Sequence, residues 1–331
     1  MLNPDLKLNV KIFNDDVDQV PIRKGFGEGL AQAGEQYPNI VALCADLTES
    51  TQMHFFKQKF PERFVEIGVA EQNLVTVASG MAAMGKYPFV SSYAMFSPGR
   101  NWEQIRTTIT YNNRPVVIVG SHAGVSVGPD GGTHQAIEDI ALMRVLPRMS
   151  VISPCDALQA KKAVLALAQS QQIAYLRLAR EKTPIITTDE TPFAIGKGQV
   201  FYRPDGLAHV AIIATGALTA HALRVAKDLE KKGLKIVVAN IHTIKPIDTD
   251  LLVALAKETR AIVTVEEHQI AGGLGGAVAE TLAAHVPVPI EFIGVHDEYG
   301  QSGTPNELVE HCGMGRDAIT TAVMNVLDRK K

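Results

Sequence analysis

The sequence of 331 residues contains little cysteine and almost no tryptophan, with three cysteines and one tryptophan. Cys44, Cys155 and Cys312 are odd in number and widely spaced, which argues against a disulfide framework or a zinc site and favours reduced thiols in a cytoplasmic protein. No apolar run approaches the roughly 18 residues that a membrane span needs. The segment Met1–Lys11 mixes charged and polar residues without a signal-peptide core. We therefore expect a cytoplasmic protein with no membrane partner.

The sequence also lacks a surplus of charge of either sign. Its formal net charge is −3, whereas nucleic-acid-binding proteins usually carry a basic surplus, so we expect no nucleic-acid partner. Hydrophobic residues make up 46% and charged residues 20%, which is the balance of a globular protein with complete cores. The length exceeds that of one typical domain and suits two.

Short apolar runs alternate with helical patterns through most of the chain. Runs typical of strands lie at 39–44, 88–90, 115–120, 150–153, 174–178, 209–214, 235–239, 261–265 and 289–293, and helical patterns lie at 71–84, 101–111, 156–170, 217–232 and 275–285. Such alternation is typical of a parallel sheet covered by helices. The segment 181–199 interrupts it with prolines and glycines, so we place a domain boundary there, between 1–190 and 191–331.

The predicted fold class is therefore α/β with two domains, each a mostly parallel sheet with flanking helices. The second sheet can carry one antiparallel edge strand.

Three polar segments follow predicted strands, at the sheet edge where open parallel sheets bind ligands. They are 45–50 (ADLTES), 68–73 (GVAEQN) and the long glycine-rich loop 122–135 (HAGVSVGPDGGTHQ). Long loops inside compact domains are usually functional. Each segment also has a structural interpretation: Glu71 can be a helix-start glutamate, Asp46 a cap or turn residue, and the loop a structured turn with surface histidines.

Two further motifs are weaker. The glycine run Gly272–Gly276 precedes a helix but matches neither the dinucleotide fingerprint nor the P-loop, so we interpret it as close packing of a helix on a sheet. The triplet Glu266-Glu267-His268 resembles a metal cluster but lacks further ligands at useful spacing. We predict no metal site from either motif.

Taken in order, these segments resemble the C-terminal half of transketolases, and more closely the separate C-terminal subunits of split, two-chain transketolases. The resemblance runs through 23–27 (RKGFG), 45–50, 68–73, 91–100 (SSYAMFSPGR), 122–135, 178–180 (LAR) and 241–248 (IHTIKPID). Each motif is weak alone, and their order makes the resemblance specific. It implies a thiamine-diphosphate pyrimidine-binding domain followed by a transketolase C-terminal domain.

The resemblance implies cofactor-binding roles for four residues. Glu71 would hydrogen-bond N1′ of the aminopyrimidine ring and favour its imino tautomer, which makes it catalytic as well. Tyr93 and Phe96 match the residues that stack on the ring, and Asp46 is placed with the cofactor-binding residues.

The resemblance also implies a site for sugar phosphates. The positions that match those holding the substrate phosphate are Arg23, Ser50, His122 and Arg180. Arginine suits this role because its planar fork binds phosphate oxygens in pairs. Asp130 matches the residue that binds a substrate hydroxyl, and His134 matches the catalytic histidine near the reacting carbons. The implied activity is transfer of a two-carbon ketol unit between sugar phosphates.

The family holds the cofactor's diphosphate through Mg²⁺ on a Gly-Asp-Gly segment and a later asparagine, and the sequence contains no Gly-Asp-Gly. The resemblance thus implies that an N-terminal partner subunit carries the diphosphate and magnesium site. We expect a heterotetramer of two such chains with two partners. The chain alone should form a homodimer with weak or no affinity for the cofactor.

Three alternatives differ in specific features. Ala70-Glu71-Gln72 also resembles 1-deoxyxylulose-5-phosphate synthase, but that enzyme is one long chain. The beta subunit of 2-oxo-acid dehydrogenases has a similar size but typically lacks an aspartate–histidine loop such as Asp130–His134. A non-catalytic assembly homologue would have no reason to keep Glu71, Asp130 and His134 together. The two-chain transketolase is the interpretation that these features favour.

Overall fold

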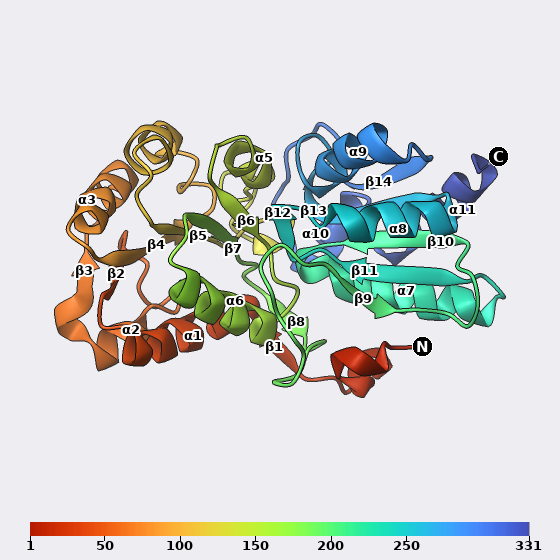
Figure 1. The fold of residues 1–331 in the computed structure, drawn as a ribbon, viewed down its shortest axis with the longest axis horizontal. Coiled ribbons are helices and arrows are strands. Elements are labelled where there is room, and N and C mark those ends of the chain that lie inside the picture. The colour runs from red at the N-terminus through yellow and green to blue at the C-terminus, as the bar shows by residue number, and fades with distance from the viewer. Residues whose placement is uncertain (331) are drawn as a thin grey trace.

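The computed structural model describes residues 1–330 and contains two large sheets side by side, each flanked by helices (Figure 1). The first sheet has seven strands, in spatial order β12 (Thr243–Lys245), β6 (Ser150–Ile152), β7 (Ala174–Arg177), β5 (Val117–Ser121), β4 (Tyr87–Tyr93), β2 (Ile40–Cys44) and β3 (Phe64–Glu66). All its neighbouring strands are parallel except β12, which pairs antiparallel with β6.

The second sheet has five strands, in spatial order β14 (Ile290–Val295), β13 (Ile262–Gln269), β10 (Val210–Ala214), β11 (Ile236–Asn240) and β9 (Gln199–Tyr202). The edge strand β9 is antiparallel to β11 and the other pairs are parallel, as the sequence led us to expect. A small antiparallel pair joins β1 (Gln19–Pro21) to β8 (Lys182–Pro184). The predicted α/β fold class is confirmed.

Helices cover both faces of each sheet (Figure 1). Those of the first half are α1 (Ile22–Gln36), α2 (His54–Lys59), α3 (Glu71–Ala83), α4 (Trp102–Gln104), α5 (Asp139–Arg144) and α6 (Ala157–Ser170). Those of the second half are α7 (Thr219–Lys231), α8 (Thr249–Thr259), α9 (Leu274–His285), α10 (Pro305–His311) and α11 (Arg316–Asp328). Short 3₁₀ turns lie at Pro4–Leu6, Val10–Phe13, Pro61–Arg63, Val125–Val127 and Gly216–Leu218. None of the helices among residues 1–330 has the length and apolar character needed to cross a bilayer.

The helix that we predicted at 101–111 differs from expectation. Only α4 is α-helical there, and Ile105–Tyr111 forms a π-helical segment with wider turns. Ile105 and Ile109 both remain buried, and Ser79 of α3 donates a hydrogen bond to the Thr108 carbonyl at 2.7 Å. Ile105 and Ile109 are four residues apart, a spacing that falls on one face of either kind of helix, so their pattern in the sequence cannot separate the two.

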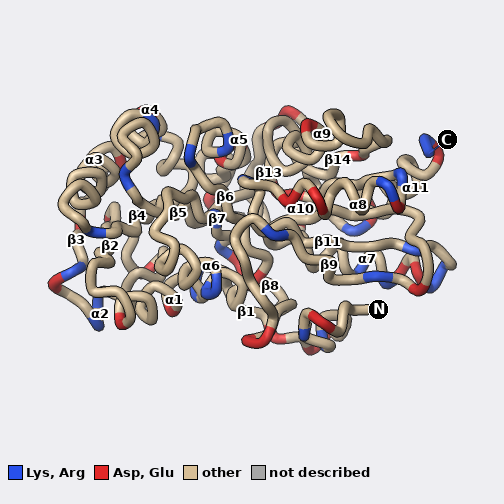
Figure 2. The backbone as a smooth tube through the Cα atoms, in the orientation of Figure 1, with Lys and Arg blue, Asp and Glu red and all other residues tan. Residues whose placement is uncertain are grey.

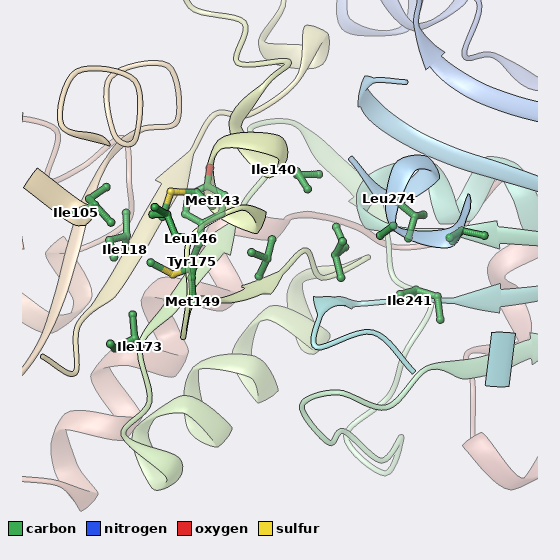
Figure 3. Close-up of a cluster of buried hydrophobic side chains, with 14 of the residues drawn as sticks. Ile105, Ile118, Ile140, Met143, Leu146, Met149, Ile173, Tyr175, Ile241 and Leu274 are labelled. Atoms are coloured by element: carbon green, nitrogen blue, oxygen red, sulfur yellow. The ribbon is translucent and has the colours of Figure 1, made fainter. Parts of the chain in front are cut away.

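One hydrophobic core passes between the two halves. It runs from Ile105 and Ile118 in the first half to Ile241 and Leu274 in the second, with Tyr175 between them (Figure 3). Strand β12 also joins the first sheet although it lies in the second half of the sequence. The division of the chain at 190/191 stays a prediction.

Candidate cofactor and substrate site

Most of the predicted site residues follow the carboxyl ends of neighbouring strands in the first sheet. Asp46 follows β2, Tyr93 ends β4, His122 follows β5, and Arg180 lies shortly after β7. Parallel strands bring their carboxyl ends to one edge, where open α/β sheets bind ligands. Glu71 begins α3, which packs on β4.

Glu71 is held by hydrogen bonds on one wall of an open pocket. Its side chain is 3% exposed, and its Oε1 accepts a hydrogen bond from Ser92 Oγ at 3.1 Å. Its Oε2 lies 3.4 Å from Nη1 of Arg100, and its backbone carbonyl accepts from Nδ2 of Asn101 at 2.8 Å. The pocket is about 530 Å³ and is lined by residues 69–73 and Arg100. A hydroxyl at the side chain and an amide at the backbone carbonyl thus hold Glu71 beside a space that a ligand could enter.

A row of rings leads from this pocket toward the glycine-rich loop. The Arg100 guanidinium lies over the Phe96 ring at 4.3 Å. The rings of Phe96 and Tyr93 lie nearly parallel, with centroids 6.1 Å apart, and Tyr93 stacks on His122 at 3.9 Å. His134 presents an edge-on contact to Phe96 at 5.3 Å. The row therefore connects the residues predicted to bind the cofactor with those predicted to bind the substrate.

His122 is buried and held in a fixed orientation. Its backbone is left-handed (φ 58°), and its Nδ1 lies 2.9 Å from Ser121 Oγ. Burial lowers the pKa of His122 to about 3, and the positive charges of Arg23 and Arg180 act in the same direction. The imidazole is consequently neutral near pH 7 and can donate or accept one hydrogen bond without adding charge.

Two arginines lie together beside His122. Arg23 donates from Nε to the Arg180 carbonyl at 3.1 Å and from Nη1 to the Ser50 carbonyl, while Arg180 donates from Nη1 to the Val127 carbonyl. Burial, followed by the charge of Arg180, lowers the pKa of Arg23. Nη2 of neither arginine makes a hydrogen bond to any group within residues 1–330. Two adjacent cations with N–H groups to spare favour an anionic ligand.

Asp130 and His134 lie on the outer part of the loop. The carboxylate of Asp130 is 3.9 Å from Arg180 Nη1 and is partly exposed. His134 is half-buried, and its Nδ1 lies 3.0 Å from Thr133 Oγ1. Asp130 thus borders the arginine pair, and His134 borders the row of rings.

Asp46 stands apart from this cluster. It is exposed, its backbone is left-handed (φ 58°), and its amide donates to Glu66 Oε1 at 2.7 Å. Glu66 Oε1 also accepts from the Gly68 amide at 3.0 Å, so it ties segment 45–50 to segment 68–73. The carboxylate of Asp46 makes no hydrogen bond or ion pair to another group in the described part of the chain. The cofactor-binding role of Asp46 stays a prediction.

Several residues that shape the site have no role predicted from the sequence. Ser92, Arg100 and Asn101 surround Glu71, and Glu66 joins two loops. Ser92 and Arg100 belong to the segment 91–100 that carried the resemblance, so polar residues beside its aromatics were a usable signal. Glu66 ends a three-residue strand and has no local pattern that indicates its role.

The glycine run 272–276 serves a structural purpose. The Glu266 carboxylate accepts the backbone N–H groups of Leu274 and Gly275, both at 2.7 Å, and so occupies the N-terminus of α9. A Cβ added at Gly275 would lie 2.7 Å from the Phe292 ring, so close helix–sheet packing requires glycine there. Burial raises the pKa of Glu266 to about 7. Residues 1–330 contain no group of three or more His, Cys, Asp or Glu side chains placed to bind a metal ion.

Comparison with protein families defines the class. The family model of the transketolase pyrimidine-binding domain matches residues 18–185, and that of the transketolase C-terminal domain matches residues 203–319. The chain belongs to the transketolase family.

Among its relatives is a protein named as a putative transketolase C-terminal section from Methanocaldococcus jannaschii, which is 41% identical over 93% of this chain and 97% of its own length. Human transketolase is 35% identical over 94% of this chain, which corresponds to 50% of that protein. A solved structure described as a split gene transketolase, an inactive beta4 tetramer, has a TM-score of 0.88 and 42% identity, and the match covers 94% of this chain and 100% of that one.

Proposed function

We propose that this chain is the C-terminal subunit of a two-chain transketolase that transfers a two-carbon ketol unit between sugar phosphates with thiamine diphosphate. The observation that carries the proposal is the continuous row from Glu71 through Phe96 and Tyr93 to His122 and the arginines. Glu71, the proposed acid for the cofactor ring, and Arg23 and Arg180, the proposed cations for a phosphate, lie near one edge of the first sheet. The relatives of similar length support the separate-subunit arrangement.

The residues fit the aminopyrimidine end of thiamine diphosphate. Glu71 places a carboxyl group on an open pocket, and the Phe96 ring lies next to it beneath Arg100. When bound, the cofactor supplies the carbanion-stabilising chemistry of its thiazolium ring. Glu71 would hold a proton at N1′ of the pyrimidine, Ser92 would orient Glu71, and Phe96 would offer its face once Arg100 moves aside. The proposal assigns Mg²⁺ and the diphosphate to the partner subunit.

The proposed substrate site is inferred from the positive charges of Arg23 and Arg180. Arg23 and Arg180 would bind the phosphate, with neutral His122 and Ser50 beside them, and Asp130 would accept a hydrogen bond from a sugar hydroxyl. His134 would exchange a proton with the reacting end of the sugar. Two relatives are named as subunits of a 6-deoxy-6-sulfo-D-fructose transketolase, from Clostridium sp., and of an apulose-4-phosphate transketolase, from Phocaeicola vulgatus, and they are 36% and 34% identical. A sugar bearing either tetrahedral anion therefore belongs in the substrate panel.

The outer face of α3 would meet the N-terminal subunit. Its exposed residues carry no charge, and they include Gln72, Asn73, Val77 and Gly80, followed by Met84 just past the helix end. In Figure 2 this helix is drawn almost entirely in tan, the colour of uncharged residues, except at its start. The helix begins at Glu71, so a subunit seated on this face would close the pocket and could bring the diphosphate site to it. Two such chains with two partners would form the proposed heterotetramer.

The proposal is tested by reconstitution with a chain that carries Gly-Asp-Gly and a downstream asparagine. We expect ketol transfer only in the mixture, and Glu71→Gln should lower turnover by at least about 100-fold while assembly is retained. Proton exchange at C2 of bound thiamine diphosphate, followed by NMR in deuterated buffer, reports the same step without substrate. Glu62→Gln, at an exposed surface pair, is the matched control. If the Glu71→Gln variant exchanges the C2 proton as fast as the parent, Glu71 has only a structural role at the start of the helix.

A non-catalytic assembly role is the second candidate. It is favoured by one observation, the description of the similar solved tetramer as inactive. The two candidates separate in the same reconstitution: an assembled complex that binds the cofactor but never transfers a ketol unit supports the assembly role.

A further inference from the structure

The second half of the chain holds the loop 122–135 by direct hydrogen bonds. Oε1 of Glu267, in β13, accepts the backbone N–H of Ser126 at 2.6 Å. Nε2 of Gln135 donates to the backbone carbonyl of Gln301, in the segment between β14 and α10, at 3.0 Å. The predicted site residues all lie in the first half, so these contacts are a route by which the second half reaches them.

Gln135 lies at the centre of this arrangement. Its side chain is 2% exposed, and Nε2 donates a second hydrogen bond to the Val125 carbonyl at 3.1 Å. One amide group therefore connects the start of the loop, its end and the segment carrying Gln301. Both partners are carbonyl acceptors, which fixes the amide with its nitrogen toward them.

Glycines allow the two segments to touch. A Cβ added at Gly300 would lie 1.8 Å from Oε1 of Gln135, and one added at Gly132 would lie 2.6 Å from the Gly300 carbonyl oxygen. Either added atom would force a shift, because such distances are far inside van der Waals contact. The segment around Gly300 thus forms a close-fitting support for the part of the loop that carries His134.

We propose that Gln135 is a positioning residue that sets the location of His134, with the segment 300–303 as its support. This inference rests on the proposed ketol transfer. His134 is the preceding residue in the chain, its amide bonds to the Gly131 carbonyl at 2.9 Å, and its ring meets the edge of Phe96. A displacement of residues 131–135 would move the His134 imidazole relative to Phe96 and Tyr93. Arg23 and Arg180 make no hydrogen bond to that stretch. Misplacement by about 1 Å can lower a rate by on the order of 100-fold.

The test uses Gln135→Met in the complete two-subunit complex, because methionine keeps the length of the side chain and removes both hydrogen bonds. We expect kcat to fall by about ten- to a hundredfold. The KM for a phosphosugar should change less than kcat, since Arg23 makes no hydrogen bond to this loop and Arg180 contacts it through the Val127 carbonyl and Asp130. Amide hydrogen exchange in residues 126–134, measured on the same complex, should become faster.

Gly300→Ala disturbs the same contact independently, from the second half of the chain. It should reproduce the loss in kcat, and the double variant should lose less than the sum of the single effects, as expected for one shared contact. Tyr299→Ala, at a residue that is 89% exposed and precedes the supporting segment, is the control and should behave like the parent.

The outcomes separate the inference from the function on which it rests. If the parent complex transfers ketol units and Gln135→Met matches it in kcat and exchange, the positioning role is overturned. A Gln135→Met variant whose KM for the phosphosugar rises and whose melting temperature falls, together with the drop in kcat, would indicate a general structural role. That result would also overturn the positioning role. If the parent transfers no ketol unit yet loop exchange accelerates, the proposed function fails while the support of the loop by Gln135 is upheld.

Discussion

At the residue scale, the most unusual feature is a pair of arginines packed beside a histidine that stays neutral. The charges of Arg23 and Arg180 act against each other and against protonation of His122, and the carboxylates of Asp130 and Glu181 lie within 4 Å of Arg180. In the proposed function, this arrangement would select for a charged group on the substrate rather than for a particular sugar.

Replacing Arg180 by Met should therefore weaken the binding of phosphorylated sugars. Loss of a charge-assisted hydrogen bond costs about 1.5–3 kcal/mol, which corresponds to a roughly ten- to hundredfold rise in KM. Steady-state kinetics with phosphorylated and unphosphorylated acceptors measures the effect, and Arg114→Met, at an exposed position, is the control. An unchanged KM for the phosphosugar together with weaker use of the unphosphorylated one would contradict the assignment.

His242 gives a second prediction, on pH and stability. It is fully buried against Phe193, and burial lowers the pKa of His242 to about 3, below the value of about 6.5 for an unfolded histidine. The unfolded state then binds more protons between these pH values, so the stability that this group contributes is complete above pH 6.5 and falls as the pH drops toward 3.

The free energy of unfolding, measured with urea between pH 4.5 and 7.5, should fall as the pH is lowered. His242→Gln should reduce the slope of this free energy against pH by up to about 1.4 kcal/mol per pH unit. The exposed His311→Gln serves for comparison. If the two variants show equal slopes, another buried group sets the acid sensitivity.

At the scale of single elements, α3 carries both the proposed catalytic acid and the proposed contact surface for the N-terminal subunit. Its buried face packs Leu74, Val75 and Ala78 into the core, its first residue is Glu71, and its outer face is uncharged. A helix built this way couples the position of the acid to whatever covers the outer face.

Gly80→Arg should test that coupling. A Cβ at Gly80 meets nothing within 4 Å, and arginine favours helix over glycine, so the chain itself should remain folded. A charge placed in an apolar interface should raise the Kd for the N-terminal subunit by at least about tenfold. Thr321→Arg, exposed on α11, controls for added charge. Parental affinity in calorimetry would exclude this face as the contact surface.

Elements were predictable from the sequence where a local pattern was enough. The strands at β2, β5 and β10 and the helix at α3 fall within a few residues of the expected bounds, because apolar periodicity and glycines mark them. Strand β12 was missed, since three residues cannot show a period and their partner β6 lies far away in the sequence.

The site was predictable only in part for the same reason. Motif order brought out Glu71 and His134, each of which sits in a polar segment after a strand. The roles of Gln135 and Glu267 depend on contacts between residues more than 100 positions apart, which no local pattern encodes.

At the scale of the whole molecule, the two halves complete each other. Strand β12 extends the first sheet, the Arg177 side chain donates to the Glu267 carbonyl at 2.8 Å, and the Asn3 amide donates to the Phe201 carbonyl at 3.0 Å. The core shown in Figure 3 is continuous across the junction.

Residues 1–190 expressed alone should therefore be poorly soluble. Removal of β12 would leave β6 as an unprotected sheet edge, and unpaired edges promote aggregation. The soluble fraction, measured by sedimentation with and without co-expressed 191–331, tests this. A monodisperse, folded fragment 1–190 would show that the halves are independent.

Both ends of the chain are anchored to the second half. The amino group of Met1 bonds to the Arg203 carbonyl, and Lys330 bonds to the His209 carbonyl, whereas α3 lies at the opposite end of the long axis (Figure 1). The two chain ends therefore lie at one end of the molecule, and the Glu71 pocket lies at the other. A tag, a surface attachment or a tether to a second chain can be placed at either terminus without crowding that pocket. Conversely, a tether meant to hold a subunit on α3 must be long enough to run the length of the molecule.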